Sequence, residues 1–182
     1  MNLPNAITLA RIVMVPFVVL FLFVSGNIGL AIALIIFLGA SVSDWLDGYL
    51  ARRNNQVTVT GKILDPVADK ILVYSVFISF VHMGQLPFWM VSIALAREFL
   101  VMALRVELAA RGIVVAASVT AKWKTILQYA TIFCVFLVLF ARPGSFASLF
   151  HVLVQVLMGG AVAVAVISGL GYALQGRKRL TT

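Results

Sequence analysis

The sequence predicts an all-α membrane protein with six transmembrane helices, organised as a single domain over residues 1–182 with both termini in the cytoplasm. Hydrophobic residues make up 63% of the chain and the mean hydropathy is +1.10, whereas soluble domains are nearer half apolar. Six apolar stretches each approach or exceed the roughly 20 residues that a helix needs to cross a bilayer. Lys and Arg are concentrated in alternate connections between these stretches, which orients the spans.

The six apolar stretches are separated by residues that favour turns. They cover, approximately, residues 6–24, 29–51, 63–83, 87–110, 122–141 and 147–174. The first has no basic segment before it and no clear cleavage site, so we expect a retained span and not a signal peptide. The second is apolar only as far as Val42, and it reaches the length of a span if its helix continues to Ala51. The break signals are Ser25-Gly26-Asn27, Gly84–Pro87, Gly112 and Pro143-Gly144.

The basic residues orient the predicted spans. Residues 25–28 and 84–86 contain no Lys or Arg, and the connection between the fifth and sixth stretches contains only Arg142. The other connections and the C-terminal segment are basic, so we expect them to face the cytoplasm together with both termini. The net charge of +8 is therefore interpreted as topology and attraction to anionic lipid, not as nucleic-acid binding. The expected location is the inner (cytoplasmic) membrane, as a multi-pass protein.

Four of the six acidic residues lie between positions 44 and 69. Helical spacing sorts the chemically distinctive residues of this segment into two faces. The first face contains Asp44, Asp47, Gly48, Ala51 and Arg52, and the second contains Gly61, Asp65 and Asp69. A short polar loop, Arg53–Thr60, is expected to join the two helices. If the helices are adjacent, four carboxylates converge on one small volume.

Carboxylates that repel one another at a membrane-embedded helix end are costly, and bound cations would offset that cost. No His or Cys accompanies the acids in this segment, so the ligand set is all oxygen and suits Mg²⁺, Mn²⁺ or Ca²⁺ better than Zn²⁺. Gly48 and Gly61 leave room for a ligand, and the guanidinium groups of Arg52 and Arg53 suit phosphate. Together these residues predict a diphosphate site. In the alternative interpretation the acids lie unpaired in the solvated interface.

This segment resembles the signature of a known family. The pattern D-x-x-D-G-x-x-A-R, eight residues, then G-x-x-x-D-x-x-x-D is similar to that of the CDP-alcohol phosphatidyltransferases, and every fixed position is present. The segments LPNAITLARIVMVPF, LDPVADKIL, REFLVMALR and KWKTILQ resemble the phosphatidylglycerophosphate synthase branch of that family. The resemblance touches most of the chain up to Gln128, and the last span carries little of it.

The resemblance implies a metal-dependent enzyme that transfers a phosphatidyl group from CDP-diacylglycerol to glycerol 3-phosphate, giving phosphatidylglycerophosphate and CMP. It implies that Asp44, Asp47 and Asp65 hold one or two Mg²⁺ or Mn²⁺ ions. Asp69 would share the second ion or act as the general base for the acceptor hydroxyl. The residues expected to line the pocket for CDP-diacylglycerol are Gly48, Ala51, Arg52 and Gly61. The family further implies a homodimer in the lipid bilayer.

The first span also has a polar face, formed by Asn5, Thr8 and Arg11 at intervals of three. Two interpretations are open. Arg11 either extends its long side chain to the cytosolic interface, or this face packs beside the motif helices. In the second case Asn5 and Thr8 help to hold the nucleotide of CDP-diacylglycerol.

Glycerol 3-phosphate carries a dianionic phosphate that the four carboxylates would repel, so the acceptor is expected to need its own basic pocket. The candidates are Arg105, Lys122, Lys124 and Arg97. Arg97 is equally well placed to form a structural ion pair with Glu98, which is also spaced to share a helix face with Arg105. The two lysines could simply mark the cytosolic side.

Other functions remain compatible with intramembrane acids. A cation transporter could coordinate a translocated ion with them, but it would not explain the glycines and arginines at matched helical positions. An intramembrane prenyltransferase also uses Asp-rich motifs, usually two separated ones, whereas this chain has one continuous motif. Within the resembled family, inositol phosphate or phosphatidylglycerol could replace glycerol 3-phosphate as the acceptor.

Overall fold

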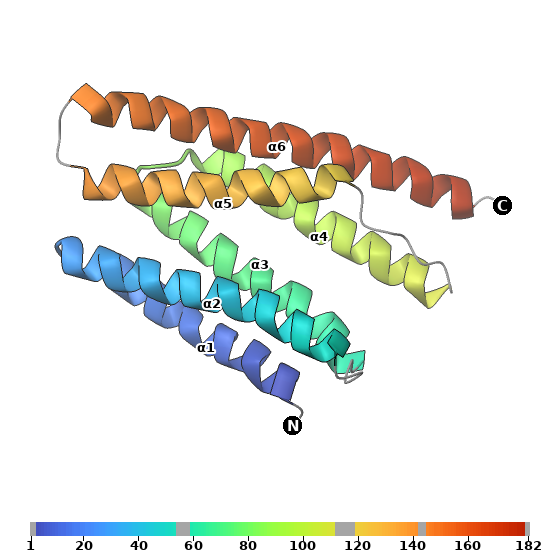
Figure 1. Ribbon diagram of the computed structural model, residues 1–182. Helices are drawn as coiled ribbons and strands as arrows, with labels where there is room; N and C mark the ends of the chain where they lie inside the picture. Colours follow the sequence, from blue (N-terminus) through green and yellow to red (C-terminus); the bar gives the residue numbers. More distant parts are fainter. Residues whose placement is uncertain (1–2, 54–58, 112–118, 142–144, 181–182) are drawn as a thin grey trace. The chain divides into compact units, whose positions relative to one another are not determined.

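The computed structural model describes residues 3–53, 59–111, 119–141 and 145–180, with side chains at 7–43, 66–109, 111, 122–141 and 148–172. Every regular element in this part of the chain is an α-helix, and it contains no strand. The six helices are α1 (Leu3–Leu22), α2 (Asn27–Arg53), α3 (Val59–His82), α4 (Phe88–Ala110), α5 (Val119–Phe140) and α6 (Ser145–Leu180) (Figure 1). The all-α prediction is confirmed.

Each predicted apolar stretch corresponds to one helix, and the boundaries differ mainly where the sequence is polar. Helix α2 continues to Arg53 and α3 begins at Val59, so the predicted loop Arg53–Thr60 is too long at both ends. Helix α6 continues to Leu180, beyond the predicted end at 174. Apolarity marks the length of a span, but a helix continues past it where residues such as Arg and Lys have good helix propensity. As a result, all the fixed residues of the motif lie within helices.

Two of the predicted break points are turns that a glycine makes possible. Gly26 has φ +93° and Gly84 has φ +71°, values in the left-handed region that glycine adopts without steric cost. Gly26 directly precedes α2. Pro87 caps the start of α4 with φ −73°, the value that its ring imposes. These residues end α1 and α3 and allow the next helix to begin within a few residues.

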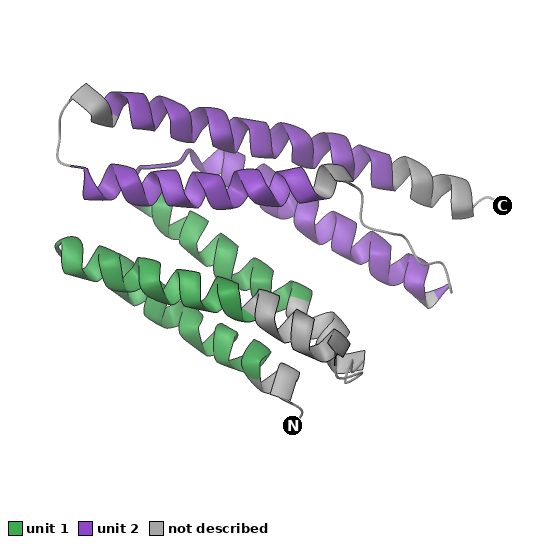
Figure 2. Ribbon diagram, viewed as in Figure 1, with its two compact units in different colours: residues 1–82 green, residues 83–182 purple. Residues whose placement is uncertain are grey.

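The chain divides into two compact units, Met1–His82 and Met83–Thr182 (Figure 2). In the first unit, α1 packs against both α2 and α3. Arg11 of α1 is buried at 1% exposure, and its Nε donates a hydrogen bond to the Ala40 carbonyl of α2 at 3.2 Å. Of the two interpretations of the polar face of α1, the one in which Arg11 extends to the interface is therefore wrong. Arg11 packs against α2, the helix that contains the first half of the motif.

In the second unit, α6 packs against both α5 and α4. The buried face of α6 repeats at helical spacing and includes Met158, Ala161 and Ala165. The small side chains at 161 and 165 leave room for neighbouring helices to approach closely. On α5, Ile132 and Phe136 are fully buried.

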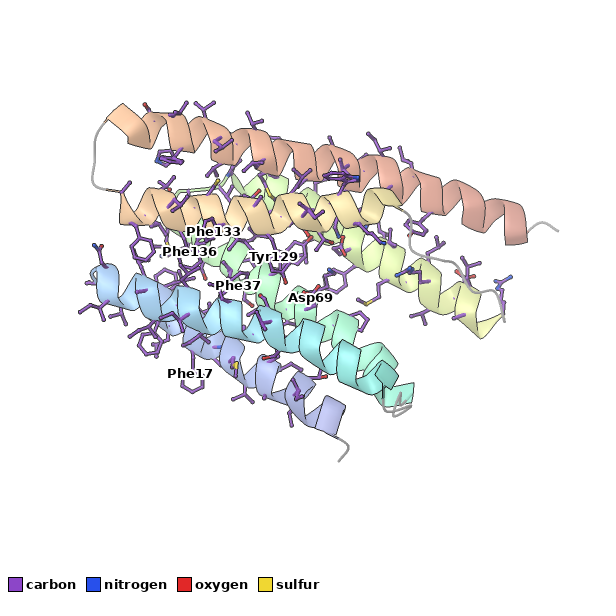
Figure 3. All side chains as sticks on the ribbon, in the orientation of Figure 1. Phe17, Phe37, Asp69, Tyr129, Phe133 and Phe136 are labelled. Carbon is purple, nitrogen blue, oxygen red and sulfur yellow. The ribbon has the colours of Figure 1, made fainter. Side chains whose placement is uncertain are left out.

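Large apolar side chains are exposed on every helix, for example Phe17 on α1, Ile78 on α3 and Phe99 on α4. Phe17 points away from the neighbouring helices of its unit (Figure 3). Among the residues with described side chains, two segments are long and apolar enough to cross a bilayer: Lys122–Phe140 and Ser148–Tyr172. Ile7–Leu22 and Asn27–Ser43 are shorter apolar helices. The prediction of six helices is confirmed, and that of six spans stays a prediction.

Two glycines of α2 provide a matched test of the close approach between α1 and α2. A Cβ at Gly29 would lie 2.6 Å from the Val24 carbonyl oxygen and 2.9 Å from that of Phe21, whereas a Cβ at Gly39 would meet nothing within 4 Å. Gly29→Ala must therefore push the turn apart, and we expect it to lower the free energy of unfolding by roughly 1–3 kcal/mol. Gly39→Ala should be neutral or stabilising, because alanine is the better helix former. Unfolding in detergent measures the stability of both variants. An equal change in the free energy of unfolding for Gly29→Ala and Gly39→Ala would contradict the tight turn between α1 and α2.

Candidate active site

The acidic motif lies on two helices of the first unit. Helix α2 contains Asp44 and Asp47 with Gly48, Ala51 and Arg52, and α3 contains Gly61, Asp65 and Asp69. Because both segments are helical, residues at i, i+4 and i+8 share a face, as the spacing predicted. The side chains of residues 44–65 and of Asn5 lie outside the described part, so the convergence of the four carboxylates stays a prediction. Thr8, on the predicted nucleotide side of α1, is buried at 1% exposure.

Asp69 is the motif carboxylate whose surroundings the structure describes (Figure 3). Its side chain is 19% exposed, and its Oδ2 accepts a hydrogen bond from Lys70 Nζ at 2.8 Å. The preceding residue, Ala68, is fully buried. The Asp69 carboxylate is therefore partly exposed and paired with Lys70. Lys70 was not among the predicted site residues, although its position next to Asp69 in LDPVADKIL was a signal that sequence reasoning could have used.

In the second unit, Arg97 of α4 is held by helix α6. Its Nε donates to the Ala165 carbonyl at 3.0 Å and its Nη2 donates to Ser168 Oγ at 2.7 Å. Its Nη1 donates to Glu98 Oε1 at 2.8 Å. All three guanidinium nitrogens are thus engaged by protein groups. These contacts favour the structural interpretation of Arg97, and we leave it out of the proposed phosphate pocket.

Glu98 is the anion of a buried charge cluster formed with Arg97 and Lys124. Lys124 of α5 donates from Nζ to the same Oε1 that accepts from Arg97. The exposures are 8% for Arg97, 8% for Glu98 and 3% for Lys124. Burying a charge is costly unless it is paired and hydrogen-bonded, and here one carboxylate compensates two cations. The cluster ties α4 to α5.

Of the remaining predicted acceptor residues, Arg105 and Lys122 are exposed, whereas Lys124 is buried. Arg105 of α4 is exposed, and its guanidinium carbon lies 5.6 Å from the centre of the buried Tyr172 ring of α6. Lys122 is exposed at the beginning of α5. Both Arg105 and Lys124 are therefore held within the second unit, one by an aromatic ring and the other by a carboxylate. Sequence spacing did not predict these partners, because the ring and the carboxylate come from other helices.

The sequence of this chain matches a known family over nearly its whole length. The profile of the family described as CDP-alcohol phosphatidyltransferase matches residues 1–167. The chain belongs to this family. That range contains the complete motif, together with the charge cluster and Arg105. It ends just before Ser168 and Tyr172, the two side chains of α6 that contact Arg97 and Arg105.

Named relatives of this chain come from several bacteria. It is 43% identical to a CDP-diacylglycerol–glycerol-3-phosphate 3-phosphatidyltransferase of Bacillus subtilis, over 70% of this chain and 72% of that one. The protein of the same name from Rickettsia typhi is 34% identical over 94% of both chains. A probable phosphatidylglycerophosphate synthase of Mycobacterium tuberculosis is 38% identical over 94% of this chain and 79% of its own length.

The buried cluster predicts a large difference between two glutamates of α4. Glu98→Ala leaves Arg97 and Lys124 buried without their shared counter-ion, so we expect the free energy of unfolding to fall by roughly 3–5 kcal/mol. Glu107→Ala is the matched control, because Glu107 pairs with Arg111 at 2.8 Å with both side chains about half exposed. Removing an exposed pair should cost at most about 1 kcal/mol. The two variants are compared by their unfolding midpoints in detergent. A Glu98→Ala variant as stable as Glu107→Ala would contradict the buried ion pairs of Glu98 with Arg97 and Lys124.

Proposed function

We propose that this chain transfers the phosphatidyl group of CDP-diacylglycerol to glycerol 3-phosphate and releases phosphatidylglycerophosphate and CMP. The observation that carries the proposal is the complete family motif on α2 and α3, in a chain 34–43% identical to proteins named for this reaction. The basic residues of α4 and α5 supply the additional feature that a phosphorylated acceptor needs. A cation transporter would use the acids but would have no use for that basic group.

The proposed setting is a bilayer crossed by all six helices, with both termini and the motif on the cytoplasmic side. Alternating basic connections support this orientation, and the apolar side chains exposed on each helix suit a lipid-facing surface. The site would open to the cytosol for CMP and sideways to lipid for the diacylglycerol tails. We also expect a homodimer, on the family resemblance, which the mass of the detergent-solubilised protein would check.

The orientation is tested with reporters. The charge pattern predicts that Thr182 and Gly84 lie on opposite sides of the membrane. A reporter fused after Thr182 should therefore be found in the cytoplasm, and a reporter inserted at Gly84 should be found on the outer side. Cytoplasmic activity at both positions would contradict the proposed topology.

The donor set fits a hard divalent cation, because the motif offers carboxylates without His or Cys on adjoining helices. Asp44, Asp47 and Asp65 would hold one or two Mg²⁺ or Mn²⁺ ions, and Asp69 would either share the second ion or act mainly as the base. When bound, such an ion supplies positive charge that offsets the donor diphosphate and the departing phosphate of CMP. Gly48 and Gly61 leave space for the diphosphate, and Arg52 with Ala51 lines the same face. Asn5 and the buried Thr8 are proposed to contact the cytidine end.

The reaction forms one phosphorus–oxygen bond and breaks another. The acceptor hydroxyl oxygen bonds to the phosphorus that carries the diacylglycerol, while the bond from that phosphorus to the CMP oxygen breaks. The hydroxyl proton passes to Asp69, the carboxylate that the structure places at a partly exposed position on α3. Lys70 donates to one oxygen of this carboxylate and so orients the side chain for proton transfer.

The acceptor phosphate is proposed to bind Arg105, Lys122 and Lys124. A guanidinium offers a planar pair of donors and an ammonium offers a point charge, and both suit a phosphate dianion. The three residues belong to α4 and α5 of the same unit.

The roles of the acids are separable. In the CMP-release assay with purified protein, EDTA or Asp65→Asn should lower turnover by at least roughly 10²-fold, the scale of a lost electrostatic stabiliser. Asp69→Asn should abolish transfer but leave metal-dependent binding of CDP-diacylglycerol largely intact, because a base is not needed for binding. Full activity after both EDTA and Asp65→Asn would end the metal proposal. Loss of donor binding in Asp69→Asn equal to that in Asp65→Asn would assign Asp69 to the metal instead.

The acceptor pocket predicts a substrate-specific defect. Arg105→Ala and Lys124→Ala should each raise the KM for glycerol 3-phosphate by roughly 10- to 150-fold, the scale of one charge-assisted contact, and spare the KM for CDP-diacylglycerol. Arg111→Ala is the control, because Arg111 is exposed and paired with Glu107. Equal effects on both substrates would mean that these residues only maintain structure or topology. Faster CMP release with inositol phosphate or phosphatidylglycerol would identify a different acceptor.

A further inference from the structure

One face of α6 contacts both arginines of α4. Ala165, Ser168, Gly169 and Tyr172 recur at i, i+3, i+4 and i+7, so they share a face. The Ala165 carbonyl and Ser168 Oγ accept hydrogen bonds from Arg97 at 3.0 Å and 2.7 Å. One turn further along, the ring of Tyr172 lies beneath the guanidinium of Arg105. We call these four residues the arginine-facing stripe of α6.

Gly169 is the position in this stripe where a side chain would crowd Arg97. A Cβ there would lie 3.2 Å from Cγ and 3.6 Å from Nε of Arg97, so the absence of a side chain lets Arg97 lie against the backbone of α6. This close approach brings Nε to the Ala165 carbonyl. Gly171, two residues further along the same helix, has nothing within 4 Å of its Cβ position. The close contact is therefore specific to Gly169.

The stripe reaches Lys124 through two further contacts. Arg97 donates to Glu98 Oε1, and Lys124 of α5 donates to that same oxygen. A displacement of Arg97 would move the carboxylate that holds Lys124, because both bonds end on one atom. The stripe thus holds Arg105 directly and Lys124 through Arg97 and Glu98.

Long cationic side chains lose rotamer freedom when they bind a ligand, and a protein that holds them in place beforehand lowers that cost. A cation over an aromatic face gains roughly 0.5–2 kcal/mol, depending on its exposure. If Gly169 served only to let helices pack closely, an arginine beside it would not be required. If Tyr172 served only to anchor α6, a cation above its ring would not be required. Here the glycine lies beside Arg97 and the tyrosine beneath Arg105, the two arginines of α4.

We propose that Ser168, Gly169 and Tyr172 are positioning residues for the acceptor phosphate, holding Arg105 and, through Arg97 and Glu98, Lys124 in the geometry that binds glycerol 3-phosphate. This proposal rests on the proposed function, which assigns the phosphate to Arg105 and Lys124. It extends the acceptor site to residues beyond position 167, where the family profile ends. Specificity for a phosphorylated acceptor would then depend partly on the last helix.

The test uses two matched pairs of variants in the full-length protein, purified in detergent. Gly169→Ala is compared with Gly171→Ala, and Tyr172→Leu with Tyr172→Phe, which keeps the ring. Tyr172→Leu should raise the KM for glycerol 3-phosphate by roughly 3- to 30-fold, the range of a lost cation–π contact. Gly169→Ala should also raise it, because the added Cβ displaces Arg97. Both variants should leave the KM for CDP-diacylglycerol within about twofold. Gly171→Ala and Tyr172→Phe should keep both values near those of the wild type. Ser168→Ala, which keeps the helix and removes one acceptor of Arg97, should resemble Gly169→Ala.

The outcomes separate this inference from the proposed function. If Arg105→Ala and Lys124→Ala raise the acceptor KM but Gly169→Ala, Ser168→Ala and Tyr172→Leu do not, the positioning role is overturned and the acceptor pocket stands. If Arg105→Ala and Lys124→Ala also leave the acceptor KM unchanged, the pocket and the positioning role both fail. Equal rises in the KM of both substrates, or a lower unfolding temperature with unchanged KM values, would assign the stripe to stability alone and overturn the inference.

Discussion

Two cations and one carboxylate are buried together where α4, α5 and α6 meet, and the second unit depends on their mutual compensation. An uncompensated charge in such surroundings would cost several kcal/mol, so Glu98 cannot be separated from Arg97 and Lys124 without penalty. Each partner fixes a helix: Lys124 belongs to α5, and Arg97 reaches across to α6. Apolar contacts between these helices are not directional, whereas the hydrogen bonds of the cluster set which side chains face one another.

The same arrangement explains how an apolar helix can contribute to a polar site. Helix α6 offers Arg97 a backbone carbonyl, a hydroxyl and the space left by a glycine, and it offers Arg105 an aromatic ring. None of these groups is charged, so α6 keeps the apolar character of a segment long enough to cross a bilayer. A helix of this kind can hold cations without the cost of burying charges of its own.

The first unit contains the acidic motif, on α2 and α3. Arg11 of α1 is buried and donates a hydrogen bond to the Ala40 carbonyl of α2. Helix α2 also contains Asp44 and Asp47. Asp69, on α3, is paired with Lys70 and partly exposed. The anionic motif and the cationic group of α4 and α5 lie in different units of the chain.

Sequence alone determined the helical class, the number of helices, the turns at Gly26 and Gly84, and the family motif with its spacing. These features are local: a period of 3.6 residues, a left-handed glycine or a fixed interval is contained in neighbouring residues. Spacing also left Arg97 with two interpretations and gave Lys124 no partner, because Glu98 and Lys124 are separated by 26 positions. Only the tertiary structure decided that Arg11 is buried and that Ser168, Gly169 and Tyr172 face the arginines of α4. Arg11 and its partner Ala40 are 29 positions apart, and the contacts between α4 and α6 join residues more than 60 positions apart. No periodicity along the chain encodes which faces of two helices meet.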